Sequence, residues 1–124
     1  GALAPSNGED VVASFSNYGK INVDVFAPGA KIYSTTPENE YDTKGGTSMA
    51  APAVAGVAAL IRSYFPKLSA SQVKSVLMAS ALPKNGDVMI GGNPDKKSSF
   101  DDLSKSGKMV NAYNAFILAS KMSK

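Results

Sequence analysis

The 124-residue sequence contains no cysteine and no histidine. Without cysteine, the chain cannot form a disulfide, a thiolate metal site or a cysteine nucleophile. Without histidine, it lacks a common zinc ligand and also the usual general base of serine hydrolases near neutral pH. Catalysis by any serine of this chain would therefore require a base from outside these residues.

The sequence also lacks long apolar runs and dense clusters of one charge. The longest apolar run, residues 49–61, contains Pro52 and Gly56 and is too short to span a bilayer. The chain opens with no signal-like leader. Thirteen basic and ten acidic residues give a net charge of +3, with the lysines scattered along the chain. We therefore expect neither a membrane span nor a nucleic-acid partner.

Hydrophobic residues make up 44% of the chain, enough for one globular unit. Alternating apolar residues predict strands at 11–15 and 21–26, followed by a short extended segment at 30–35. Polar residues predict a loop over 36–46. From Ser48 to about Tyr64 the sequence is apolar on nearly every side, which predicts a helix that is buried all round.

Two further helices are indicated by their N-terminal residues. Ser69 and Gln72 have the spacing of a capping box, which predicts a helix that ends before Pro83. Residues 83–108 are rich in Gly, Lys, Asp and Ser, and predict a long exposed loop with at most a brief strand at 89–90. Asn111 is then expected to cap a last helix. No repeat and no linker divides the chain, so we expect a single domain.

Ser48 lies in the segment GGTSMAAP, residues 45–52, where polar sequence turns into the apolar helix. A helix N-terminus carries free amides and a partial positive charge, which would stabilise the oxyanion formed when a serine oxygen attacks a carbonyl. Thr47 is predicted as the N-cap, with Pro52 tolerated one turn inside the helix. The alternative is that Ser48 only assists this cap. The residue pattern alone leaves both interpretations open.

Several motifs occur in series along the chain. The sequence GTSMAAP at 46–52, followed by VAG at 54–56, resembles the nucleophile motif of the subtilisin-like serine proteases, the subtilases. Segments that resemble the family's strand, turn and closing-helix segments are ASFSNYG at 13–19, VDVFAPG at 23–29, IYST at 32–35 and VNAY at 110–113. The resemblance covers residues 1–82 and 107–119, and leaves 84–106 unaligned.

This resemblance implies an α/β fold, namely the C-terminal portion of a subtilisin-like three-layer domain. That portion would have a mainly parallel sheet and a central buried helix starting at Ser48. Residues 1–124 would then be the C-terminal part of a single subtilase catalytic domain. By the family pattern Ser48 is the nucleophile of a serine endopeptidase and forms the acyl-enzyme, and its amide contributes to the oxyanion hole. Thr47 would assist there, and Met49 would border the scissile bond.

The family's catalytic aspartate, histidine and oxyanion asparagine have no counterpart in these residues, so the isolated chain is expected to be inactive. The resemblance implies protein or peptide substrates, the missing N-terminal part of the domain as a partner, and a secreted or cell-envelope location. It implies no catalytic cofactor and no catalytic metal. Asp24 is the one candidate ligand for a structural calcium ion in the full domain.

Some features leave alternatives open. Ala53 stands where the family most often has a second, noncatalytic histidine, and we expect local repacking there. Lys44 is close enough in sequence to suggest a serine–lysine pair with Ser48, although a solvated loop lysine is the favoured interpretation. The competing function is a noncatalytic subtilase-like structural or interaction module. Exposed apolar faces would also favour self-association of the isolated chain.

Overall fold

The computed structural model describes residues 1–124 and contains three α-helices, eight short strands and one 3-10 helix. The elements in chain order are β1 (Ala2–Leu3), β2 (Ala27–Pro28), β3 (Ile32–Thr36), β4 (Glu40–Lys44), α1 (Thr47–Tyr64), α2 (Ala70–Ala79), β5 (Leu82–Pro83), β6 (Asp87–Ile90), β7 (Asn93–Ser99), η1 (Phe100–Asp102), β8 (Lys108–Met109) and α3 (Ala112–Met122). None of the helices combines the length and hydropathy that crossing a bilayer requires.

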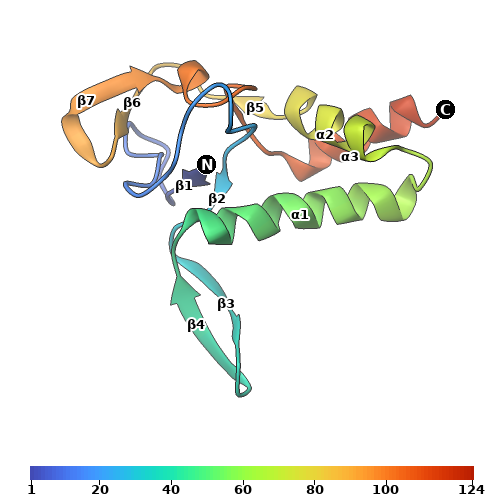
Figure 1. Cartoon of the computed structure of the whole chain (residues 1–124), viewed down its shortest axis with the longest axis horizontal. Helices are drawn as coiled ribbons and strands as arrows, with labels where there is room; N and C mark the ends of the chain where they lie inside the picture. The colour runs from blue at the N-terminus through green and yellow to red at the C-terminus, as the bar shows by residue number, and fades with distance from the viewer.

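The helix α1 runs along one side of the molecule, and β1, β2, α2 and α3 pack against it (Figure 1). The strands β1 and β2 contact α1 near its N-terminal end through small side chains, and α2 and α3 cover its C-terminal half. The helical part of the core consists of Ile61, Leu68, Val73, Val76, Leu77, Ala115 and Ala119. This packing places the start of α1 against the strands.

The caps predicted for α2 and α3 are confirmed. Ser69 Oγ accepts a hydrogen bond from the Gln72 amide at 3.2 Å, and the Ser69 amide donates to Gln72 Oε1 at 2.8 Å. At the start of α3, Asn111 Oδ1 accepts from the Asn114 amide at 2.8 Å. Each cap satisfies amides that have no partner inside the helix.

The predicted α/β class is confirmed, but a mainly parallel sheet does not form within these residues. The strands make four two-stranded sheets, and only the β1–β2 pair is parallel. The strand predicted at 11–15 is reduced to one bridge between Val12 and Leu3. The strand predicted at 21–26 is reduced to one parallel bridge between Phe26 and Met109, and β2 begins at Ala27. Both predicted strands were too long because alternation shows which residues suit a strand, whereas this chain supplies only short partners, the two-residue β1 and the two-residue β8.

The predicted polar loop 36–46 is wrong over half its length, because β3 and β4 form an antiparallel hairpin. The register runs from Ile32 opposite Lys44 to Thr36 opposite Glu40, and the hairpin projects away from the body of the molecule (Figure 1). The sequence of the hairpin is polar and does not show a strand pattern, because neither face of the hairpin is buried. Its β4 strand leads directly into the start of α1.

The long exposed loop predicted over 83–108 is also wrong. The strands β6 and β7 pair as an antiparallel hairpin, with Gly91 and Gly92 at its turn in left-handed conformation. The ring of Phe100, just after β7, lies 5.2 Å from that of Phe26 and is fully buried. This hairpin region contributes to the second core cluster, which contains Leu3, Val11, Val12, Phe26, Val88, Ile90, Phe100 and Leu103. A few apolar side chains therefore anchor residues 83–108 to the core, although their sequence is typical of a loop.

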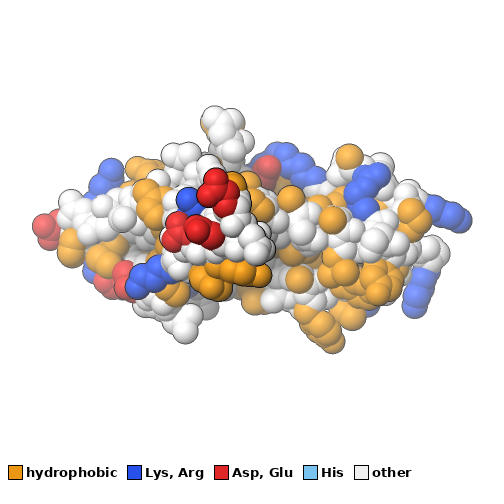
Figure 2. Space-filling model, turned by 90° about the horizontal axis from the view of Figure 1, so that it is seen from below, with side chains coloured by type: hydrophobic (Ala, Val, Ile, Leu, Met, Phe, Trp, Pro, Cys, Tyr) orange, Lys and Arg blue, Asp and Glu red, His pale blue; other side chains and the backbone are white.

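The burial predicted for α1 on every side is not seen within this chain. Only Ala50 and Ile61 of its 18 residues are buried. One stripe along the helix is open, and hydrophobic side chains are spread over this side of the molecule (Figure 2). The stripe consists of Ala51, Pro52, Ala55, Gly56, Ala59 and Leu60. The helix is apolar enough for a central position, but no element of these residues lies on its outer face.

Candidate functional site

The start of α1 is held against the segment after β2 by a close backbone contact. The Gly46 amide donates to the Gly29 carbonyl at 2.8 Å. A Cβ at Gly29 would lie 2.6 Å from the Ala2 Cβ and 2.9 Å from the Gly46 oxygen, closer than real Cβ atoms come. Glycine at position 29 therefore permits the approach that positions the first turn of α1.

Gly46 is the N-cap of α1, with φ 155° and ψ 159°. This backbone conformation is almost restricted to glycine. The prediction that Thr47 is the N-cap is therefore wrong by one residue, and the helix begins at Thr47 and not at Ser48. The physical reason is that Gly46 turns the chain into the helix through its backbone alone, so no side chain is needed for a cap.

Ser48 is the second residue of α1 and is exposed to solvent. Its hydroxyl makes no hydrogen bond within the chain, and its amide has no backbone partner. The interpretation in which Ser48 assists the cap is therefore not supported. Pro52, four residues later, has no amide hydrogen for the Ser48 carbonyl. The serine thus presents a free hydroxyl beside a free amide.

The electrostatic environment of Ser48 is set by the helix end. The first turn of α1 contains no acidic residue that would neutralise the positive end of the helix dipole. Lys44 does not form the serine–lysine pair considered above. Its Nζ lies 3.7 Å from Asp42 Oδ2 in an exposed salt bridge, and it makes no hydrogen bond to Ser48. A developing negative charge at Ser48 would therefore meet backbone donors and the helix dipole.

Thr47 and Met49 flank Ser48 and are half-buried. Thr47 lines a hollow of about 330 Å³ together with Asp24, which comes from the segment before β2. Asp24 Oδ2 lies 3.1 Å from Lys74 Nζ, and no three acidic residues of the chain form a cluster suited to a metal ion. A lysine ammonium beside the carboxylate opposes cation binding, so these residues do not by themselves fit a calcium ion.

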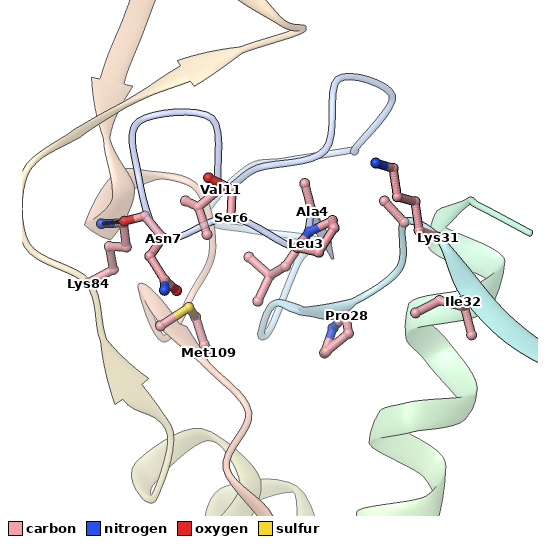
Figure 3. A pocket seen from close by; sticks show the side chains of 12 residues that line it. Leu3, Ala4, Ser6, Asn7, Val11, Pro28, Lys31, Ile32, Lys84 and Met109 are labelled. Carbon is pink, nitrogen blue, oxygen red and sulfur yellow. Dashed lines mark hydrogen bonds between the residues drawn. The ribbon is translucent and has the colours of Figure 1, made fainter.

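The sequence-based reasoning missed two features beside the site. One is the Gly29–Gly46 contact, although Gly29 closes the VDVFAPG motif. The other is a groove of about 630 Å³ whose lining includes Lys31 and the two sequence neighbours of Gly29, Pro28 and Ala30 (Figure 3). Neither feature leaves a signal in sequence periodicity, because each depends on segments that meet only in the fold.

An exposed serine at an unneutralised helix N-terminus, preceded by a glycine turn in an α/β fold, offers backbone donors to a negative charge that develops there. Comparison with known proteins gives the family. The model of the subtilase family matches residues 4–113, so the chain belongs to the subtilases, a family of subtilisin-like serine proteases.

Individual relatives agree with this assignment. Subtilisin DY of Bacillus licheniformis is 55% identical over 69 residues, which is 56% of this chain and 25% of that protein. Thermitase of Thermoactinomyces vulgaris is 46% identical over 80 residues, which is 64% of this chain and 28% of thermitase. A chain in a structure of the subtilase cytotoxin SubAB assembly superposes with a TM-score of 0.68 at 29% identity, over 86% of this chain and 29% of that one. This chain thus spans between a quarter and a third of each relative.

Proposed function

We propose that these residues form the C-terminal part of a subtilase catalytic domain, a serine endopeptidase in which Ser48 is the nucleophile. The observation that carries the proposal is the exposed Ser48, whose hydroxyl and amide are both free at the N-terminus of α1. Family membership supports the reaction class, and because the chain contains no histidine we propose that the general base comes from outside these residues.

The proposed reaction uses these groups in order. A base from the remainder of the domain takes the Ser48 proton as Oγ attacks the substrate carbonyl carbon. The tetrahedral oxyanion accepts a hydrogen bond from the Ser48 amide, and one such donor contributes on the order of 3 kcal/mol to transition-state stabilisation. The peptide C–N bond then breaks, the amine leaves with a proton, and water hydrolyses the acyl-enzyme. Thr47 assists the oxyanion hole and Met49 borders the scissile bond.

The open stripe of α1 supports the proposal that the rest of the domain packs on its outer face. In the complete protein α1 would then become the central buried helix. Alone, the 124 residues lack the base and expose this stripe, so we propose that they are inactive and self-associate. By analogy with the subtilisins, the substrates are proteins or peptides and the location is secreted or cell-envelope. A structural calcium ion near Asp24 stays a prediction, and it would require further ligands from outside these residues.

The direct test is peptide hydrolysis by the full-length protein and its Ser48→Ala variant. We expect kcat to fall by a factor of about 10⁴ or more, because the nucleophile is removed. Ser63→Ala is the matched control, since Ser63 is an exposed serine of the same helix whose hydroxyl donates to the Leu60 carbonyl at 2.9 Å. Retention of activity in Ser48→Ala would contradict the proposal and leave the noncatalytic module as the function.

A further inference from the structure

The groove next to Gly29 has a distinct charge pattern. Its floor is formed mainly by apolar side chains, including Leu3, Val11 and Met109. Lys84 and Lys31 stand at its opposite ends (Figure 3), and no acidic residue lines it. The volume of about 630 Å³ lies within the range of roughly 300–1,000 Å³ that is typical of ligand sites.

Neither lysine is neutralised by a carboxylate within the chain. The salt bridges use Lys20, Lys44, Lys74 and Lys97. Lys84 Nζ instead donates to the Asn7 carbonyl at 3.0 Å, which fixes its position and leaves its charge unpaired. Lys31 is exposed and makes no side-chain hydrogen bond. An occupant with an apolar centre and anionic ends would complement both the floor and the two cations.

The groove is also joined to the candidate nucleophile through the backbone. Pro28 and Ala30 line it, and Gly29 between them accepts the hydrogen bond of Gly46, two residues before Ser48. The groove and the start of α1 thus adjoin the same segment, and a polypeptide that extends from Ser48 is the occupant that we consider. Binding energy from such remote contacts can be used to raise kcat/KM.

We propose that this groove is an accessory substrate site that binds an acidic, apolar-centred peptide segment away from the scissile bond. The inference rests on the proposed protease function for the identity of its occupant. The groove binds the segment through its apolar floor, and Lys31 and Lys84 select carboxylates over neutral or basic side chains.

The test measures binding separately from catalysis, by fluorescence anisotropy with the full-length Ser48→Ala protein. The probe is a labelled peptide with a glutamate at each end of a leucine- and alanine-rich centre, and its control has glutamine at both ends. We expect the acidic peptide to bind several-fold more tightly, and Lys31→Glu/Lys84→Glu to weaken it by about 10-fold. Lys31→Glu alone is a milder variant, because Lys31 is exposed and forms no salt bridge, and it should weaken binding in the same direction.

The matched control is Lys67→Glu/Lys105→Glu, which changes the net charge equally at exposed lysines outside the groove. Three results would overturn the accessory site. The two double variants could weaken peptide binding equally, or the acidic and glutamine peptides could bind equally. The protein could also bind decanoate in place of the acidic peptide. Peptide hydrolysis that depends on Ser48 without selective acidic-peptide binding would refute only the groove. Selective binding without Ser48-dependent hydrolysis would refute only the protease function.

Discussion

Gly46 determines the angle at which the backbone enters α1 and so where the Ser48 amide points. Its φ of 155° and ψ of 159° are strained for any residue with a Cβ, although an added Cβ would meet no atom closer than the Ser48 nitrogen at 3.7 Å. The requirement for glycine is therefore conformational and not a matter of space. Gly29 differs from Gly46, because at position 29 an added Cβ would collide with neighbouring atoms.

We predict that Gly46→Ala lowers the free energy of unfolding by about 1–3 kcal/mol, because alanine must adopt this conformation or shift the first turn of α1. Gly45→Ala is the matched control, since its φ is not in the left-handed region and its nearest contact to an added Cβ is 3.6 Å. Urea denaturation of the full-length variants measures both effects. A Gly46→Ala protein as stable as Gly45→Ala would show that the conformation of Gly46 is not a constraint.

At the scale of single residues, the sequence correctly predicted that Ser48 lies at a helix start. It did not reveal the glycine turn at Gly46 that places Ser48 there. The GTSMAAP motif carried the family resemblance, which the family comparison confirms. Thr47 was preferred as the cap because threonine is a common N-cap, whereas glycine can turn the chain without any side-chain bond. The roles of Ser48, Thr47 and Met49 in catalysis stay predictions.

At the scale of elements, helices were predictable because their signals are local. The capping residues Ser69 and Asn111 make the expected hydrogen bonds, and α2 and α3 follow them directly. Strands were less predictable because a strand is defined by its partner, which sequence periodicity does not reveal. The β3–β4 hairpin shows the limit, since its strands bury neither face and read as a loop.

The β6–β7 region provides a test of whether this unaligned segment is structural. We predict that Phe100→Ala lowers the free energy of unfolding by about 3–5 kcal/mol, because it removes a fully buried ring that packs on Phe26. Tyr113→Ala should cost less than about 1 kcal/mol, since Tyr113 is 73% exposed. Urea denaturation of the full-length proteins measures both. Equal costs would mean that the region is only a surface loop.

At the scale of the whole molecule, α1 has more apolar side chains than the other elements of this chain bury. Its outer stripe is open to solvent, and the chain spans only 25–29% of the relatives described above. Hydrophobicity on all sides predicted a helix buried all round, which these residues do not provide, and composition does not reveal which segment would supply a covering face. Under the proposed function the catalytic groups are divided, with Ser48 in these residues and its activating groups in the remainder of the domain.

This division is tested most directly by the rate at which a fluorophosphonate labels Ser48, measured by mass spectrometry of the digested protein. In the full-length protein we predict rapid labelling on Ser48, and none at this position in Ser48→Ala. The isolated 124 residues should react more slowly by a factor of about 10³ or more, because the histidine base is absent. An adduct on another residue, or equal rates for the full-length protein and the isolated chain, would contradict the account.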